Sequence, residues 1–511
     1  MTRTRNVADI IKQPFTTTLG TSNYRAGVNA GNSIASGGNF NVTVGDEAGT
    51  AITTGDENVT VGYQAGDALT TGHTNIAIGA ESLSTEDTGR RNVAIGHAAL
   101  KTQNSDADNY NVAVGYNAGK LVTTGIQNTL IGGLAGDALT DADQNAAFGV
   151  TALGSDTLGS RSTAIGTNAL SDQNFTSATN TYNTAVGYNA GAATTTGTNN
   201  TLIGGLAGDA LTDGDNNVAV GTSALSANTR SDRNVAIGSS ALGAMNITSH
   251  TDTYNVAVGC LAGAAVTTGS QNTFVGGLAG DATDDGTGNV AVGHGTLSAN
   301  CGNDNTAVGK FASVLCTGAN NTSLGADAGS AQTSGGNNIF LGHDAGRTGS
   351  PGGNITTANN ILCLGDDNIA TANIQVDWTV ASDQRDKTDF TALDLGLDFV
   401  KALAPVTYKW DKRSKYGDKT ADDYDLAAQT PDGTHKEDWL DIGFKAQEVQ
   451  ALEEAAGYTT AAKKNLTVST SGDGKQMGLQ YSKFVPILVK AIQEQNALIV
   501  ALTARVATLE G

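Results

Sequence analysis

The stretch NTLIGGLAGDALTD at residues 128–141 recurs unchanged at residues 200–213. Its first five residues are one copy of a pentad, Asn-x-x-(Val/Ile/Leu)-Gly, which the chain repeats with small variations in 19 units, most of them 17 residues apart. Self-similarity at a short, fixed period is typical of a solenoid in which each repeat forms one coil. Clear copies begin at Asn41, Asn58, Asn75, Asn92, Asn111, Asn128, Asn200, Asn217, Asn255, Asn289, Asn305, Asn321 and Asn338, and degenerate ones at Asn145, Ser162 and Asn360.

Each pentad fits one strand of a parallel β-solenoid. The Val and Ile residues at positions two and four point to the same face of a strand, so we expect the stacked coils to turn them into apolar columns. The Gly at position five permits backbone angles that are closed to other residues, and the Asn at position one can satisfy turn amides with its own side chain. The tripeptide Thr-Thr-Gly recurs between the pentads, for example at residues 53–55 and 123–125, and predicts a second corner in each of these coils.

The residue between the two apolar positions faces the other way and is usually Ala, as in Ala94, Ala113, Ala219, Ala236, Ala257 and Ala291. Small residues there would let another subunit pack closely, and one chain alone looks too thin to be stable. We therefore expect a homo-oligomer. The unit resembles the β-roll of trimeric autotransporter adhesin heads, whose repeats carry an Asn-x-Val-Ala-(Ile/Val)-Gly core, and this resemblance favours a homotrimer.

A longer period of 72 residues lies on top of the pentads, because near-copies of a four-coil block begin at Asn111, Asn183 and Asn255. The last coil of each block is lengthened to 19 or 21 residues and ends in a tyrosine: Tyr110, Tyr182 and Tyr254. We expect these tyrosines to line up along one edge, about 19 Å apart, since neighbouring strands are about 4.8 Å apart. They are candidate receptor contacts that stack on sugars, or they are corner residues packed under the lengthened coil.

Composition excludes several classes of protein. The chain has 66 Gly but only 5 Pro, which suits an ordered repeat better than a disordered linker. Its net charge of −21, from 29 Lys and Arg against 50 Asp and Glu, argues against nucleic-acid binding. No apolar run approaches the roughly 20 residues of a membrane span, and the N-terminus lacks the apolar core of a signal peptide. We therefore predict no membrane insertion.

The sequence also predicts neither a metal nor another cofactor. The four Cys and six His show no ligand spacing. Asp-rich corners such as DADQN at residue 141 lack the nine-residue glycine-aspartate pattern of calcium-binding β-rolls, and Asp and Asn are ordinary turn formers.

After Gly365 the pentads stop and the composition changes. Residues 393–405 indicate a helix that ends at a proline, residues 406–410 a strand, and residues 446–456 a second helix. This part of the chain is predicted to be a compact α+β module.

The chain closes with a long helix whose apolar residues alternate at spacings of three and four, the pattern of a coiled-coil seam. With Ile or Val at one core position and mostly Leu at the other, the seam by itself leans towards a dimer. Gln495 would mark the register or hold a central anion or water, or it is a polar residue that the core tolerates. The seam consists of Val485, Leu488, Ile492, Gln495, Ile499, Leu502, Val506 and Leu509.

Three motifs in the C-terminal part closely resemble one family. They are SDQRDKTDF at residues 382–390, DIGFKAQEVQ at 441–450 and LQYSKFVPILVKAIQEQNALIVAL at 479–502. The family is the intramolecular chaperone and auto-processing domain of phage tail fibres, endosialidase tailspikes and some membrane-tethered eukaryotic factors. The resemblance implies that this domain trimerises, templates the folding of the β-structure before it, and is then cut off by its own serine and lysine.

On this resemblance Ser382 is the nucleophile and Lys387 the general base of a single-turnover self-cleavage. A serine hydroxyl is a poor nucleophile until a base takes its proton, and a lysine amine can do so only if burial or a nearby cation lowers its pKa. We predict a cut between Ala381 and Ser382, with the bond after Ser382 left open. A spacing of five shares neither a helix face nor a strand face, so we expect a bent loop, completed by assembly, to join the pair.

We divide the chain into an N-terminal virion-attachment segment (residues 1–37), a β-solenoid shaft of about 19 coils (38–366), a linker (367–381) and a chaperone domain with a C-terminal trimeric coiled coil (382–511). The predicted function is that of a phage tail fibre that is assembled in the host cytoplasm, joins virion tail proteins through its N-terminus and contacts a host surface glycan or protein. The alternatives are a bacterial trimeric surface adhesin and a polysaccharide-degrading tailspike.

Overall fold

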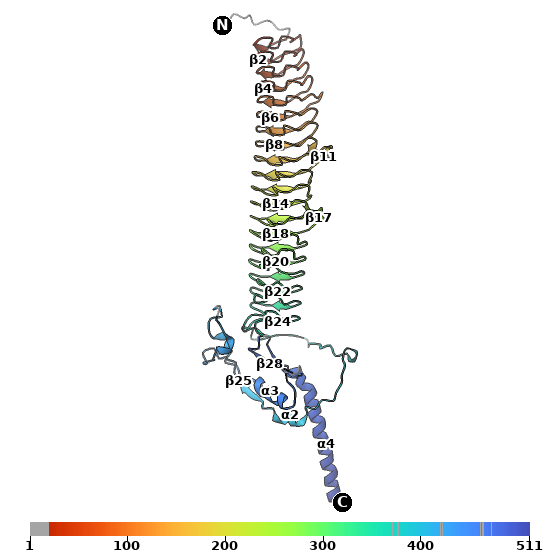
Figure 1. Cartoon of the computed structure of the whole chain (residues 1–511), viewed down its shortest axis with the longest axis vertical. Helices are drawn as coiled ribbons and strands as arrows, with labels where there is room; N and C mark the ends of the chain where they lie inside the picture. Colours follow the sequence, from red (N-terminus) through yellow and green to blue (C-terminus); the bar gives the residue numbers. More distant parts are fainter. Residues whose placement is uncertain are drawn as a thin grey trace. The chain divides into compact units, whose positions relative to one another are not determined.

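The computed structural model describes residues 20–369, 371–375, 378–419, 421, 423–459, 461, 464, 466–471 and 473–511. The chain divides into two compact units after Asn305. The first unit is a parallel β-solenoid, and the second contains further coils followed by the α+β region (Figure 1). The predicted fold class, mainly β with a long parallel β-solenoid and a small α+β region ending in a helix, is confirmed.

In the first unit, three-residue strands stack in chain order, each parallel to the next and in register, as in the pairing of Val93 with Val112. The second unit repeats this arrangement over four more strands. All 19 pentads form such a strand. The strands of the first unit are β1 Tyr24–Ala26, β2 Val42–Val44, β3 Val59–Val61, β4 Ile76–Ile78, β5 Val93–Ile95, β6 Val112–Val114, β7 Thr129–Ile131, β8 Ala146–Phe148, β10 Thr163–Ile165, β12 Thr184–Val186, β13 Thr201–Ile203, β14 Val218–Val220, β16 Val235–Ile237, β18 Val256–Val258, β19 Thr273–Val275 and β20 Val290–Val292; those of the second are β21 Thr306–Val308, β22 Thr322–Leu324, β23 Ile339–Leu341 and β24 Leu362–Leu364.

The ladder begins before the predicted start of the shaft. Strand β1 pairs in parallel with β2, so residues 20–37 already contain a coil upstream of the boundary placed at residue 38. The rest of the proposed attachment segment, residues 1–19, lies outside the described residues.

The predicted orientation of the strands is wrong. The central residue of the pentad points into the coil, as in the fully buried Ala113, whereas its neighbours Val112 and Val114 are only partly buried. The interior is narrow, so a large central residue requires a glycine opposite: a Cβ on Gly136 would lie 2.7 Å from Leu130 Cδ2. Apolar side chains at position four therefore form a column on the outside; the most exposed in the first unit are Ile78, Phe148, Ile165, Ile203, Ile237 and Val275.

The asparagines at position one satisfy backbone groups with their side chains, as predicted, and together they form a buried ladder. The backbone N–H of Asn58 donates to Asn41 Oδ1 at 3.0 Å, and Asn58 Nδ2 donates to the carbonyl of Gly72 at 2.8 Å. Asn75 repeats the first contact on Asn58. Each side chain thus pairs one donor and one acceptor that a turn would otherwise leave buried and unsatisfied, a loss that costs about 1–3 kcal/mol per group.

The pentad glycine is required by both backbone angle and space. Gly115 has a φ of +147°, and a Cβ there would lie 2.3 Å from the carbonyl oxygen of Gly132 in the next coil. No residue with a side chain fits a backbone approach of that kind.

The lengthened coils add short parallel pairs at the corner that precedes each tyrosine. Strand β9 (Gly159–Ser160) pairs with β11 (Thr179–Asn180), and β15 (Ser231–Asp232) pairs with β17 (Thr251–Asp252). In the lengthened coil that ends at Tyr110, a single bridge between Arg90 and Asp108 takes this place.

The region after the last coil contains short elements around one small core. They are η1 Gln384–Asp386, α2 Leu397–Ala402, β25 Val406–Tyr408, η2 Arg413–Lys415, η3 Leu426–Ala428, β26 Asp441–Gly443, α3 Ala446–Ala455, β27 Val468–Thr470, β28 Met477–Leu479, η4 Tyr481–Lys483 and α4 Phe484–Glu510. The predicted helices and strand are present, although α2 begins four residues later than expected. The core contains Leu395, Phe399, Val449, Val468, Phe484 and Ile487.

Candidate functional site

A single turn of 3₁₀ helix, η1, places the predicted catalytic pair. Asp383 caps the turn by accepting the backbone N–H of Arg385 at 2.9 Å, and its carboxylate forms an ion pair with the Arg385 side chain. The side-chain hydrogen bonds from Arg385 hold the pKa of Asp383 below its usual value. The turn lies between Ser382 and Lys387 in the chain.

Ser382 and Lys387 are in hydrogen-bonding contact. Lys387 Nζ donates to Ser382 Oγ at 2.5 Å and lies 3.4 Å from the carbonyl oxygen of Ser382. Both residues are exposed. The predicted bent loop is therefore η1, and it brings the pair together within one chain; what this chain lacks at the pair is the burial that favours a neutral lysine.

Helix α4 presents two different surfaces. Phe484, Ile487 and Ala491 are buried and pack towards the module. The predicted seam is exposed from end to end, with exposed fractions of 64% at Ile492 and 62% at Leu502, and Gln495 is exposed as well. Together with η4 this helix, Tyr481–Glu510, is long and apolar enough to cross a membrane by length and composition.

The three predicted receptor-contact tyrosines share one environment. About half of each side chain is exposed, and an arginine of the preceding coil lies over each ring. The Nη1 of that arginine donates to the tyrosine hydroxyl at 2.7–3.1 Å. The pairs are Arg91 with Tyr110, Arg161 with Tyr182 and Arg233 with Tyr254. The sequence predicted the tyrosine row but not the arginines.

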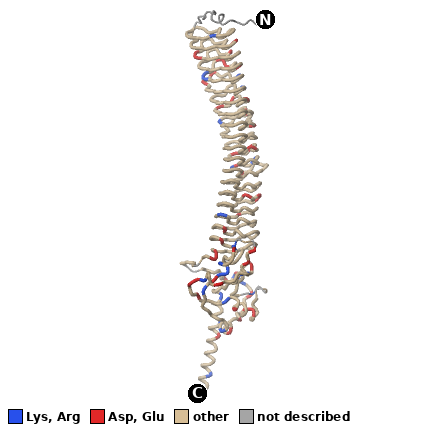
Figure 2. Tube along the Cα trace, turned by 90° about the vertical axis from the view of Figure 1, so that its left-hand side faces the viewer, with Lys and Arg blue, Asp and Glu red and all other residues tan. Residues whose placement is uncertain are grey.

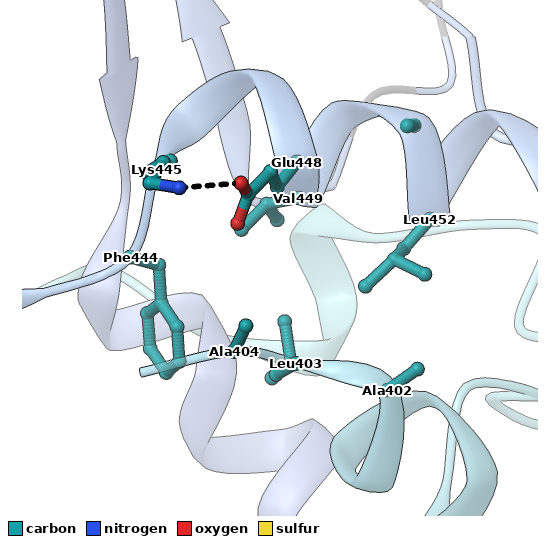
Figure 3. A pocket seen from close by; sticks show the side chains of 9 residues that line it. Ala402, Leu403, Ala404, Phe444, Lys445, Glu448, Val449 and Leu452 are labelled. Carbon is teal, nitrogen blue, oxygen red and sulfur yellow. Dashed lines mark hydrogen bonds and ion pairs between the residues drawn. The ribbon is translucent and has the colours of Figure 1, made fainter. Parts of the chain in front are cut away.

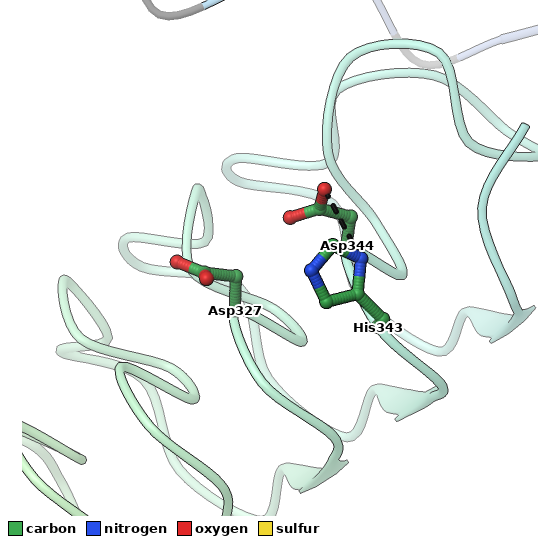
Figure 4. A group of neighbouring side chains, drawn as sticks. All are labelled: Asp327, His343 and Asp344. Atoms are coloured by element: carbon green, nitrogen blue, oxygen red, sulfur yellow. Dashed lines mark ion pairs between the residues drawn. The ribbon is translucent and has the colours of Figure 1, made fainter.

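Asp327, His343 and Asp344 form a cluster that the sequence did not predict (Figure 4). His343 Nδ1 lies 3.3 Å from Asp344 Oδ2. Arg347 Nη1 lies 2.7 Å from Asp344 Oδ1 and 3.7 Å from Asp327 Oδ1, so one guanidinium already lies between the two carboxylates and offsets part of their charge. This charge pattern is that of an ion-pair network, and we assign no metal to it.

A shallow apolar cavity of about 300 Å³ opens between the end of α2 and helix α3 (Figure 3). Leu403, Phe444 and Leu452 line it, and an ion pair of 2.7 Å between Lys445 and Glu448 lies at its rim. Neither Ser382 nor Lys387 belongs to its lining, so the cavity is separate from the catalytic pair.

The segment after the last strand is held to the α+β region by charge. Asp367, in the predicted linker, has a nearly buried side chain whose Oδ2 lies 2.6 Å from Lys419 Nζ. Lys412 Nζ donates to the Asp367 carbonyl at 3.2 Å, and Asp473 Oδ2 accepts the backbone N–H of Asn354 at 3.0 Å. The two parts are therefore joined by contacts that do not depend on the peptide bonds beside Ser382. Charged residues are sparse along the coils and denser in this region (Figure 2).

Residues 382–458 match the family model described as the chaperone of endosialidase. The match begins at Ser382 and includes Lys387, α2 and α3. No curated protein matches the chain. The predicted resemblance of the C-terminal part is therefore confirmed, and together with the β-solenoid it indicates a tail-fibre-like or tailspike-like protein.

Proposed function

We propose that the chain is the subunit of a homotrimeric phage tail fibre that contacts the host cell surface, and that its C-terminal module drives assembly and then cuts itself off beside Ser382. One observation carries the proposal. A chain whose C-terminal module matches the chaperone of endosialidase exposes apolar surfaces on both its solenoid and its last helix.

The solenoid surface is the outer column of position four. Ile131, Phe148 and Ile165 are direct neighbours in this column, since their strands pair in register. A continuous apolar stripe on a protein surface marks an interaction site. Other copies of this chain are suitable partners. If the copies lie parallel, their position-four columns have the same spacing between strands, so each apolar side chain can meet its counterpart.

The second surface is the exposed seam of α4. Residues that alternate at spacings of three and four bury themselves when parallel helices supercoil around each other. The residues of the seam alone favour a coiled coil of two helices. The resemblance to a domain that trimerises supports three, and a buried coiled coil also accounts for the apolar character of α4 without a membrane.

Trimer formation would switch on the catalytic pair by burying it. Lys387 Nζ lies 2.5 Å from Ser382 Oγ, within reach of the hydroxyl proton that a general base must accept, but it is exposed to water. Transfer out of water disfavours the charged amine, so a neighbouring subunit that covers residues 382–387 would make the lysine a base. Self-cleavage would then report that the fibre has assembled.

The reaction needs only these two side chains and water. Ser382 Oγ attacks the carbonyl carbon of Ala381 while its proton passes to Lys387 Nζ, and the same proton then goes to the departing nitrogen of Ser382. Water hydrolyses the resulting ester, which restores the hydroxyl. The bond after Ser382 is the second candidate, because Lys387 Nζ also lies 3.4 Å from the carbonyl oxygen of Ser382.

In this proposal residues 1–37 dock to virion tail proteins, the coils contact a host glycan or protein, and the fibre assembles in the host cytoplasm before it joins the virion. The net charge of −21 argues against a nucleic-acid partner. A bacterial surface adhesin or a polysaccharide-degrading tailspike are the alternatives. Incubation with purified bacterial envelope polysaccharides separates them: binding without shorter products supports the fibre, and depolymerisation supports the tailspike.

The oligomer is tested by Phe148→Lys together with Ile165→Lys. Both side chains are exposed in one chain, so the coil keeps its own stability within about 0.5 kcal/mol, whereas the trimer is lost because charges enter its interface. Thr196→Lys, at an exposed TTG corner, is the matched control and stays trimeric. Light scattering after size exclusion measures the mass; a wild type that is monomeric, or a double variant that remains trimeric, contradicts the proposed interface.

A further inference from the structure

The residue that directly precedes each ladder position forms a second outward column. From Arg91 to Gln271 every residue of this column is exposed and has a left-handed backbone, with φ between 52° and 66°. Such angles are uncommon outside glycine. Their recurrence shows that the backbone makes the same corner at this position in every coil. We call this column the edge track: Arg91, Tyr110, Gln127, Gln144, Arg161, Tyr182, Asn199, Asn216, Arg233, Tyr254 and Gln271.

The edge track has a chemical repeat. Its order is Arg, Tyr and two amide residues, which recurs every four coils. Neighbours along the track bond one another: Gln144 Nε2 donates to Gln127 Oε1 at 3.0 Å, Arg161 Nε to Gln144 Oε1 at 2.9 Å, and Arg161 Nη1 to the Tyr182 hydroxyl at 2.9 Å. The side chains are therefore held in a row and need little ordering when a ligand binds.

The groups on the track match a chain of sugars. Amides offer both donors and acceptors, and guanidinium groups offer donors in a fixed plane. An arginine lies over each tyrosine ring, yet about half of each tyrosine stays exposed, and this exposed part offers an aromatic surface to the C–H face of a sugar. Tyr110 and Tyr254 are eight coils apart, about 38 Å at about 4.8 Å per strand, so the ligand that matches the whole track is a polymer.

The charges of the track favour an uncharged polymer. Arg91 is paired with Asp108, and Arg233 with Asp252. Arg161 has no carboxylate partner within the described part of the chain, where Asn180 stands at the position equivalent to those aspartates. With a net charge of −21, the molecule repels polyanions over a long range.

We propose that the edge track binds one extended, uncharged polysaccharide that runs along the stacked coils, with Tyr110, Tyr182 and Tyr254 as stacking platforms. This rests on the proposed receptor-contacting function and names its ligand class. A protein ligand matches the track less well, because amide residues fill the positions between successive Arg and Tyr pairs, whereas the centre of a protein interface is mostly apolar.

The test is affinity electrophoresis of the full-length protein in gels that contain a β-glucan, an α-mannan or a galactan, with polygalacturonate as the charged arm. We expect retardation by at least one neutral polymer, and a weakening of at least about tenfold when Tyr110, Tyr182 and Tyr254 are all changed to Ala. Tyr116→Ala with Tyr188→Ala is the matched control, because both rings are about 60% exposed but lie outside the track. The control should bind as wild type does.

Three results overturn the proposal: no retardation by any neutral polymer, retardation by polygalacturonate alone, or equal binding by the triple variant. A second measurement, binding of the same proteins to a panel of bacterial envelopes, distinguishes a failure of the edge-track proposal from a failure of the proposed receptor-contacting function. If wild type and triple variant bind an envelope equally, the track is wrong and the receptor function stands; if wild type binds none of the envelopes, the receptor function fails.

Discussion

The amine of Lys387 donates a hydrogen bond of 2.5 Å to the hydroxyl of Ser382 within a single chain. The turn η1, capped by Asp383, brings the two residues together although five positions separate them. Both side chains are nevertheless exposed. Assembly is therefore not needed to join the pair, and what it has to supply is the burial of the amine.

Ser382→Ala and Lys387→Ala should both leave the chain uncut and still trimeric, because neither residue belongs to the apolar surfaces. Lys387→Arg should also stay uncut, since a guanidinium does not lose its proton in a protein. Denaturing gels and size exclusion measure the two properties separately. Lys401→Ala, an exposed lysine on α2, is the control and is cut as wild type is. A shortened chain in Ser382→Ala would assign the cut to another group.

Ile499→Asp should abolish both the trimer and the cut, although it lies far along the chain from the catalytic pair. Ile499 is 55% exposed in one chain, so the module still folds. In a coiled coil it would bury an unpaired carboxylate, at a cost on the order of several kcal/mol. Ala497→Asp, on the opposite side of the helix, is the control. A monomer of Ile499→Asp that cuts itself at the wild-type rate refutes the coupling.

Gly115→Ala should lower the unfolding free energy of the solenoid by about 1–3 kcal/mol or more. The φ of +147° is strained for a residue with a side chain, and the added Cβ would clash with the carbonyl of Gly132. Gly133→Ala is the matched control, since nothing lies within 4 Å of a Cβ there and its stability should be almost unchanged. Chemical denaturation of the two variants gives both values. Equal losses would mean that the coils relax around the added methyl group.

Asp156 should make the solenoid relatively more stable as the pH falls from 7. Burial raises the pKa of its carboxyl, against hydrogen bonds from Gln173, Phe175 and Gly159. A carboxyl whose pKa is higher in the folded state binds protons more tightly there, so its protonation favours folding. Asp156→Asn lacks this contribution; Asn228 occupies the equivalent place 72 residues later. Wild type should therefore gain unfolding free energy relative to Asp156→Asn as the pH is lowered. Asp141→Asn, at an exposed corner, is the control, and a difference independent of pH contradicts the argument.

The repeat, its strands and the use of the Asn side chain to satisfy backbone amides could be predicted from the chemistry of the repeated residues. The Asn58 side chain accepts the backbone N–H of Asn75, and Gly115 lies against the backbone of Gly132, so each acts on a residue that follows 17 positions later. The chaperone-like module could be predicted from motifs around Ser382 and Ile442, and its resemblance is confirmed.

Which face of each strand points into the coil could not be predicted from the sequence. Alternate residues of a strand point to opposite faces, but this alternation does not say which of the two faces is inside. A narrow coil has room for Ala113 but not for Val112 and Val114, so the usual expectation of large apolar residues inside is reversed. The signal was present in Leu130 and Phe274, which occupy the central position where glycines make room for them.

The contacts of the tyrosines were not predicted, although the repeat places Arg161 and Tyr182 at equivalent positions of neighbouring coils. Whether the two side chains bond each other depends on their conformations, which the repeat pattern does not show. Likewise the approach of Lys387 to Ser382 depends on the cap that Asp383 places on η1.

The intact mass of freshly made wild-type protein, measured under denaturing conditions, tests the central claim most directly. The account predicts two chains in equal amounts, one that ends beside Ser382, at Ala381 in the favoured case, and one that contains the rest of the sequence. A single chain with the mass of all 511 residues, isolated from assembled trimers, would contradict the claim that this module cuts itself off.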